Sequence, residues 1–399
     1  MSQVLERVSM EELVQRARSL IPVLRSRARS VEEARRVSAE TTAMLRDADL
    51  YRLMQPARFG GFEYGFTELI DIVFEIGRGC GSSAWCYGLG AVHQWLLATF
   101  PLQAQEEVWG QDANTLVCGS YAPAVSAVRS GAGFEISGKW SFASNCDNSQ
   151  WALVGVRFPA EADGKPRPGF LLIPRRDYDI EDDWFTVGLA GTGSKSVVVR
   201  DKLFVPEHRV LTFEQASSNN PPGAAAHANW VYRIPFLAGV PVSIASPALG
   251  MVQGAIDEFA EFATGRTTRG AVAGGGNPIA QFPQVQSRIA EAAAALDAAK
   301  LLLKRDTREV EASAAKGQPI SVEKRIRNRR DHAYAVRLAA QAVNALFENV
   351  GGGGLNLASA IQRHWRDVNA VAHHVSLNWD AVSTMYGQHS LGLEPKGQY

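Results

Sequence analysis

Residues 191–209, GTGSKSVVVRDKLFVPEHR, contain the stretch that decides how this chain folds. A turn of small residues, Gly191–Ser194, leads into an apolar run from Ser196 to Val205, and Pro206 follows it. Glycine and serine are typical of tight turns, and a valine-rich run of this length is typical of a β-strand. The stretch therefore predicts a strand that turn residues bound on both sides.

Other runs of strand length precede this one along the chain. They are Thr115–Tyr121, Gly133–Ser141, Trp151–Arg157 and Gly169–Pro174, and turn residues separate them. Short strands at this spacing are typical of a barrel or a sandwich. We therefore predict a middle β domain over residues 114–214, built as an antiparallel barrel or sandwich.

Helical patterns fill residues 1–113, which we predict to form an N-terminal helical domain. Glu11–Arg27 and Val31–Leu50 carry apolar residues three and four apart, with charges between them. Pro22 is expected to kink or restart the first helix, because proline interrupts a helix interior. Ser30 is expected to cap the second helix, because serine is a favoured N-cap residue.

The helical period returns after a linker at residues 215–227, so residues 215–399 are predicted to form a C-terminal helical bundle. Gln284–Val310 and Glu323–Val350 are its longest amphipathic patterns. Ile234–Ile256 contains no charged residue, but prolines and polar residues interrupt it. We interpret it as a buried helix rather than a membrane span. The fold class is therefore α+β, with more helix than strand.

Composition excludes several classes of function. Lys+Arg and Asp+Glu both number 41, so the basic excess typical of nucleic-acid binding is missing. The four cysteines have no metal-binding spacing and indicate a reducing compartment without disulfides or a metal site. The first residues, MSQVLERVSM, contain no apolar segment of a secretory signal. We expect a cytoplasmic protein that binds neither nucleic acid nor membrane.

Two phrases, in their order along the chain, resemble the acyl-CoA dehydrogenase superfamily. One is the turn and strand of residues 191–209. The other is the glycine turn within Glu348–Leu355, followed by Arg363–Asp367, RHWRD. The resemblance covers essentially the whole chain. It implies the three domains given above, a four-helix bundle as the last of them, and a homotetramer.

A dehydrogenase of that superfamily needs a carboxylate that takes a proton from the acyl-CoA. The resemblance places this base either just after the arginine–aspartate pair or on the first helix of the bundle. Val368–Trp379 and Gln215–Ile256 both lack Asp and Glu. The fold alone does not fix the function, and a dehydrogenase is disfavoured here.

Three other phrases resemble the oxygenase branch of the superfamily. They are AVHQW at 91–95, WSFAS at 140–144, and WRD at 365–367 with His374 eight residues after Arg366. This branch comprises oxygenase components of two-component flavin-dependent monooxygenases, among them 4-hydroxyphenylacetate hydroxylase, secosteroid phenol hydroxylase and dibenzothiophene monooxygenase.

The resemblance implies reduced FMN or FAD as cofactor and O2 as co-substrate. These form a C4a-hydroperoxyflavin that hydroxylates a small aromatic substrate, phenolic or indolic. Gly77–Gly81 lacks the spacing and context of a dinucleotide-binding loop. A separate NAD(P)H:flavin reductase is therefore expected to supply the reduced flavin.

The resemblance also assigns residues to the cofactor. Ser144 is placed beside the flavin N5, small neighbours let the backbone approach the ring, and Trp140 and Phe142 exclude water. Asn145 stands where the family commonly has glycine. The other cofactor assignments are Thr192, Ser194, Arg266, Gly352 and Gly353, with Arg269 a weaker one. The alternatives are a solvated loop for the arginines and a plain helix–helix turn for the glycines.

Two histidines are the candidate catalytic groups, since histidine titrates near neutral pH. His374 is expected to hydrogen-bond or protonate the peroxide, and His93 to accept the proton of a phenolic hydroxyl. Ser120 is a second partner for that hydroxyl, and Trp95 is expected to contact the substrate. The alternatives are a surface or core histidine for His374, a satisfied core histidine for His93, and a polar strand end for Ser120.

Three other functions remain open on the sequence alone. The first is oxygenation at sulfur or nitrogen, which does not require His93 as a base. The second is an acyl-CoA dehydrogenase with an unrecognised base. The third is a flavin-binding or structural relative without catalysis. The identity of the substrate, the choice between FMN and FAD, and the choice between dimer and tetramer are also open.

Overall fold

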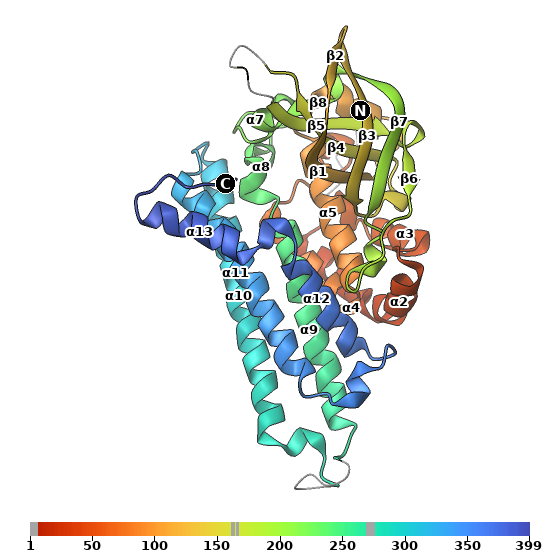
Figure 1. Ribbon diagram of the computed structural model, residues 1–399, viewed down its shortest axis with the longest axis vertical. Helices are drawn as coiled ribbons and strands as arrows, with labels where there is room; N and C mark the ends of the chain where they lie inside the picture. The colour runs from red at the N-terminus through yellow and green to blue at the C-terminus, as the bar shows by residue number, and fades with distance from the viewer. Residues whose placement is uncertain (1–6, 161–163, 165–166, 269–275) are drawn as a thin grey trace.

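The computed structural model describes residues 7–160, 164, 167–268 and 276–399. Helices begin the chain, two sheets follow, and long helices end it (Figure 1). The sheets lie at one end of the molecule, and α9, α10 and α11 extend away from them towards the other end. The predicted α+β order is confirmed.

The N-terminal helices pack around α4 and α5. Pro22 lies in the first turn of α2, where its missing N–H breaks no helical bond, so it restarts the helix as expected. The prediction that Ser30 caps a helix is wrong, because Ser30 lies inside α2. The Ser30 hydroxyl donates a hydrogen bond to the Arg27 carbonyl of the same helix (2.8 Å). Ser38 is the cap that begins α3. The helices are α1 (Met10–Ser19), α2 (Ile21–Ala34), α3 (Ala39–Asp47), α4 (Phe66–Gly79), α5 (Gly81–Leu97) and α6 (Leu102–Trp109).

The β domain is a pair of four-stranded sheets. One has the order β1-β4-β5-β8 and the other β2-β3-β7-β6. The expectation of a wholly antiparallel domain is wrong at one pair, because β1 and β4 run parallel. The chain leaves β1, runs back through β3 in the other sheet, and so enters β4 in the direction of β1. The strands are β1 (Val117–Ser126), β2 (Val128–Ser130), β3 (Gly133–Ala143), β4 (Trp151–Phe158), β5 (Arg167–Pro174), β6 (Asp179–Glu181), β7 (Lys195–Pro206) and β8 (Val210–Thr212).

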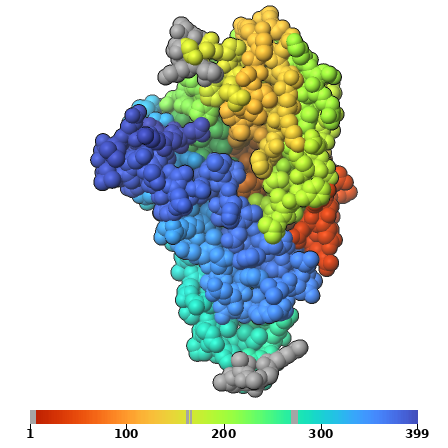
Figure 2. Space-filling model, in the orientation of Figure 1, coloured from red at the N-terminus to blue at the C-terminus, as the bar shows by residue number. Residues whose placement is uncertain are grey.

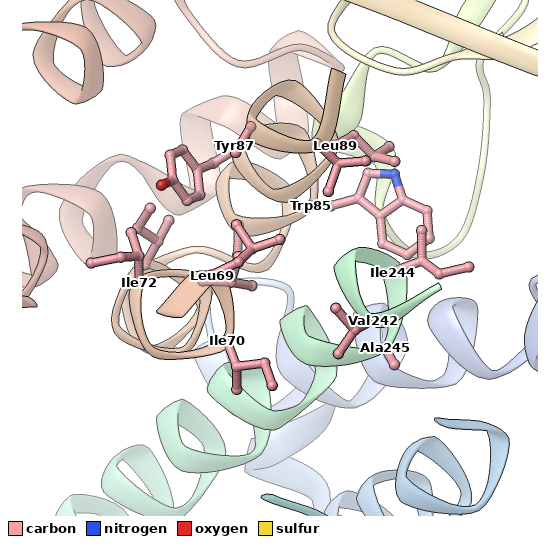
Figure 3. Packing of buried hydrophobic residues seen from close by; sticks show 14 of the residues in the cluster. Leu69, Ile70, Ile72, Trp85, Tyr87, Leu89, Val242, Ile244 and Ala245 are labelled. Carbon is pink, nitrogen blue, oxygen red and sulfur yellow. The ribbon is translucent and has the colours of Figure 1, made fainter. Parts of the chain in front are cut away.

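The C-terminal region contains the expected bundle, formed by α9–α12. The apolar helix α9 is central: it contacts the other three and also packs on α4 and α5. Within Phe236–Thr264, the most apolar stretch of 18 residues is 89% buried, which confirms the interpretation as a core helix. Figure 3 shows side chains of α4, α5 and α9 packed together in this core. The helices are α7 (Phe213–Ala216), α8 (Phe236–Gly239), α9 (Val242–Thr264), α10 (Pro283–Ala315), α11 (Val322–Phe347), α12 (Ala360–Ala372) and α13 (Trp379–Ser390).

Candidate active site

A chain of buried hydroxyl groups lies where β3 ends. Ser144 Oγ accepts a hydrogen bond from the Trp85 indole (3.0 Å) and contacts Ser194 Oγ (2.7 Å). Ser194 Oγ contacts Thr192 Oγ1 (2.6 Å), which donates to the Leu189 carbonyl (2.8 Å). Every contact is satisfied when each hydroxyl donates to the next, from Ser144 towards Leu189. The structure thus brings together Ser144, Thr192 and Ser194, three residues that the resemblance assigned to the cofactor.

A bulge in β3 lets two of its aromatic side chains, Trp140 and Phe142, point in different directions. The register with β7 shifts between Trp140 and Ala143, and Phe142 has a left-handed φ of 68°. Such strain is typical of functional sites, where bulges redirect side chains. The Phe142 ring is 69% exposed, whereas Trp140 is fully buried and donates to the Gly155 carbonyl inside the sandwich. Of these two rings, Phe142 is therefore the one that a ligand at this surface can contact.

Asn145 follows the bulge with a left-handed φ of 61°. Asparagine tolerates this conformation better than most residues, so it can replace the glycine that the family commonly has. Its backbone N–H donates to the Thr192 carbonyl (2.9 Å). Asn145 therefore adopts a conformation that glycine also allows, and its backbone links the bulge to the turn that contains Thr192.

The arginine–aspartate pair of α12 holds the loop that ends at the hydroxyl chain. Asp367 accepts a hydrogen bond from the Leu189 N–H (2.7 Å), and Arg366 donates to the Val187 carbonyl (2.6 Å). Burial raises the pKa of Asp367 to about 6. Figure 2 shows the C-terminal helices meeting the β domain along one face of the molecule. This pair has a structural role, because it fixes the loop to the bundle.

His374 lies beside the Trp85 indole, in the turn that follows α12. The two rings are 5.7 Å apart between centroids. His374 Nδ1 accepts a hydrogen bond from the Ser376 N–H (3.2 Å). Burial, with a smaller effect of the Arg329 charge, lowers the pKa of His374 to about 4. The ring is therefore neutral at physiological pH and carries its proton on Nε2, where it can act as a donor.

His93 has the opposite arrangement within α5. Its Nδ1 lies 2.6 Å from the Val117 carbonyl, which can only accept, so Nδ1 carries the proton. Nε2 is buried and has no hydrogen-bond partner among the residues that the structure describes, and burial lowers the pKa of His93 to about 4. A Cβ atom at Gly119 would lie 2.8 Å from this nitrogen, so glycine leaves the approach open. His93 thus presents a free, buried acceptor.

The other two residues assigned to the substrate have different environments. Ser120 donates to the Ser141 carbonyl (2.7 Å) and so ties β1 to the bulge of β3. Trp95 is fully buried in the core, donates to the Val231 carbonyl (2.8 Å), and packs edge-on against Phe66. The structure therefore does not bring Trp95 to His93, because residues two apart on a helix face in different directions.

Tyr121 is a residue that the sequence reasoning missed. Its ring packs edge-on against His93, with centroids 5.6 Å apart. Its hydroxyl is buried and has no hydrogen-bond partner in the described part of the chain. Two neighbouring buried polar atoms, His93 Nε2 and the Tyr121 hydroxyl, therefore lack partners in that part of the chain, and both indicate a ligand site at this point. The signal in the sequence was the strand period, because Gly119 and Tyr121 are two apart and share a face of β1.

The second group of cofactor assignments lies elsewhere. The Arg266 guanidinium lies over the Phe262 ring and against Gly353, where a Cβ atom would be 2.7 Å away. Phe262 is in the last turn of α9, Arg266 follows that turn, and Gly353 belongs to the turn after α11. By contrast, Gly88 of α5 contacts α9 in its first turn, at Ser243. A helix of 23 residues is about 34 Å long at about 1.5 Å per residue. The structure therefore divides the predicted cofactor set in two, and Arg269 lies outside the described residues.

Comparison with known proteins identifies the family. Residues 10–113 match the acyl-CoA dehydrogenase N-terminal domain and residues 242–379 the C-terminal domain. The chain is 46% identical to the oxygenase component of an FADH2-dependent resorcinol hydroxylase from Rhizobium sp. (strain MTP-10005), over 97% of this chain and 96% of that protein. The chain belongs to the oxygenase components of flavin-dependent monooxygenases.

Solved structures agree with this oxygenase family. The 3-HSA hydroxylase from Rhodococcus sp. RHA1 aligns with a TM-score of 0.90 at 36% identity and covers 97% of this chain and 98% of its own. XiaF from Streptomyces sp., in complex with FADH2 and glycerol, aligns with a TM-score of 0.88 at 28% identity and covers 98% of this chain and 97% of its own. The predictions of the fold, the family and a reduced flavin cofactor are confirmed.

The residues of this oxygenase fit a reduced flavin. An exposed aromatic ring, Phe142, offers an apolar surface to a planar ring system. Ser144, two residues later, has a hydroxyl that the Trp85 indole contacts, and His374 on the same indole has a neutral N–H donor. Apolar surface beside a few convergent polar groups is typical of a cofactor site.

Proposed function

We propose that this oxygenase hydroxylates a small phenolic compound at the site between His93 and His374. The observation that carries the proposal is the buried, unpartnered Nε2 of a neutral His93. An acceptor of this kind fits a phenolic hydroxyl, and the similar resorcinol hydroxylase is named for a phenol. Resorcinol itself is the first compound to test.

Each residue has a separate task in this reaction. Bound reduced flavin supplies the two electrons with which dioxygen is activated. Phe142 and Ser144 hold and orient the flavin ring, and the His374 Nε2–H donates a hydrogen bond to the oxygen that reacts. His93 Nε2 accepts a hydrogen bond from the substrate hydroxyl, which makes the aromatic ring more electron-rich. It takes the proton as the ring is attacked, because the hydroxyl then becomes acidic enough for a base whose pKa is about 4. One oxygen atom enters the ring and the other leaves as water.

The test is turnover with isotopically labelled dioxygen. The purified protein is mixed with a flavin reductase, NADH, FAD and resorcinol, and the products are identified by mass spectrometry. We expect a trihydroxybenzene that carries one labelled oxygen atom. Thioanisole and indole serve as parallel substrates, because oxygenation at sulfur or at an indole ring needs no base to remove a hydroxyl proton.

The matched control is His93→Gln, which keeps an amide near the Val117 carbonyl but lacks a basic nitrogen. We expect this variant to consume dioxygen and release it as hydrogen peroxide instead of forming product. The proposal fails if the wild-type protein yields only hydrogen peroxide with every phenol, or if His93→Gln hydroxylates as fast as the wild type.

We further propose that a separate NAD(P)H:flavin reductase supplies FADH2 and that the oxygenase is a homotetramer. FADH2 is supported by two similar proteins: the resorcinol hydroxylase is named as FADH2-dependent, and XiaF was solved in complex with FADH2.

The homotetramer is supported by the position of Arg266 and Gly353. They lie at the far end of α9 from Ser144, so we assign them to the flavin of another copy. Light scattering gives the mass of the assembly, and Arg266→Gln is expected to weaken FAD more than riboflavin.

We also propose a cytoplasmic location. The four cysteines are buried and free, as expected in a reducing compartment, and the apolar helix α9 is buried in the bundle. Cell fractionation tests this location, and recovery of the protein with the membranes would contradict it.

A further inference from the structure

The most unusual charge in the described chain is Arg329 on α11. Its side chain is only 7% exposed, and its Nε and Nη1 atoms are buried without a hydrogen-bond partner. One helical turn further, His332 is 1% exposed, and neither of its ring nitrogens has a hydrogen-bond partner among the described residues. Residues three apart on a helix are neighbours, so these groups share one face of α11. A buried charge without a partner is costly and requires an explanation.

No carboxylate compensates Arg329 within the part of the chain that the structure describes. The nearest acidic residues along α10 and α11 are already paired. Asp306 is bonded by Arg305 (2.9 Å), and Asp331 is bonded by Arg330 (2.6 Å). Burial alone lowers the pKa of Arg329, to about 10, so the guanidinium remains charged at neutral pH.

The pair faces the region of the active site. α11 packs on the turn that contains His374, and it also contacts α8. The charge of Arg329 lowers the pKa values of both His332 and His374, which places it within electrostatic reach of the two rings. His332 is neutral, since burial lowers its pKa to about 3, so it offers one donor and one acceptor rather than a second charge.

We propose that Arg329 and His332 form an oxyanion subsite beside His374, which binds a carboxylate or phosphate group of a small ligand. A guanidinium binds such groups with two parallel hydrogen bonds, and the His332 N–H adds a third donor. The source of the anion is either the substrate or the flavin phosphate. The subsite exists independently of the reaction, so its test does not need turnover.

The experiment measures binding to the unliganded protein by thermal shift and calorimetry. The probes are matched pairs that differ mainly in charge: 3-hydroxybenzoate with 3-hydroxybenzamide, and FMN with riboflavin. We expect the anion of at least one pair to bind about 10- to 100-fold tighter than its neutral partner, as for other hydrogen bonds to charged groups. Preference in the first pair identifies a substrate carboxylate, and preference in the second identifies the flavin phosphate.

Arg329→Gln is expected to remove the preference, and Arg266→Gln to leave the hydroxybenzoate preference unchanged. Arg329→Met is expected to raise the melting temperature of the unliganded protein, because it removes an uncompensated buried charge. The proposal is overturned if neither anion is preferred, or if Arg329→Gln keeps the preference. It is also overturned if Arg329→Met melts at a lower temperature and a crystal structure shows Arg329 paired with a carboxylate of another copy.

Discussion

His93 lies in the middle of a helix and donates its Nδ1 proton to a strand carbonyl, whereas His374 lies in a turn and accepts a backbone N–H at Nδ1. Both rings are neutral, since both pKa values are lowered to about 4. The free Nε2 atom is therefore an acceptor in His93 and a donor in His374. The comparison teaches that the backbone partner of one ring nitrogen decides the chemistry of the other.

The largest expected effect tests the acceptor. His93→Ala removes the only free basic nitrogen proposed for the substrate hydroxyl. General-base catalysis typically contributes about 10²- to 10⁴-fold, so product formation is expected to fall within this range. Chromatography measures the product, and an oxygen electrode measures total dioxygen consumption, which is expected to continue. Equal losses of product and of dioxygen consumption would instead assign His93 to the flavin.

The next effect tests the donor. His374→Ala removes the Nε2–H beside Trp85, and the loss of a neutral hydrogen bond of about 0.5–1.5 kcal/mol corresponds to about 2- to 12-fold. We expect a larger fraction of dioxygen to appear as hydrogen peroxide. His373→Ala is the matched control, because that side chain is exposed and bonds the Asn369 carbonyl. An unchanged peroxide fraction in His374→Ala would contradict the donor role.

A smaller effect is expected for Trp95, which lies two residues after His93 on α5 but is not placed at the substrate. Trp95→Phe leaves the buried Val231 carbonyl without its donor, which costs about 1–3 kcal/mol in the free energy of unfolding. Urea denaturation measures this loss. The KM for the phenol is expected to stay that of the wild type. A raised KM would show that Trp95 contacts substrate, as the sequence indicated.

The smallest effect concerns pH. An ordinary histidine is about a tenth neutral at about pH 5.5, but both rings here stay neutral until about pH 4. We therefore expect turnover to change little between about pH 7.5 and about pH 5.5. An inflection near pH 6.5 in the pH–rate profile would contradict this expectation.

The same lowered pKa values make the fold less stable in acid. The unfolded chain takes up protons below about pH 6.5, whereas the folded rings resist them until about pH 4. The contribution of neutral histidine to stability is therefore complete above about pH 6.5 and declines towards pH 4. Urea denaturation across this range measures the decline.

Much of the fold follows from local pattern. The strand of residues 195–206 was readable from its valines and its bounding turn, and α10 and α11 from their amphipathic period. Ser144, Thr192 and Ser194 were assigned by resemblance and do lie together. The parallel pairing of β1 with β4 was not readable, because it depends on the path of β3 through the other sheet.

The sequence by itself determined the order of helices and strands, the family and the two histidines proposed as catalytic groups. These features are carried by residue periodicity and by short motifs, which are local along the chain. Only the tertiary structure decided which nitrogen of each histidine is free. It also decided that, among the described residues, the Tyr121 hydroxyl has no hydrogen-bond partner and Arg329 has no acidic partner. These properties depend on carbonyls, amides and charges that lie far apart in sequence and meet only when the chain is folded.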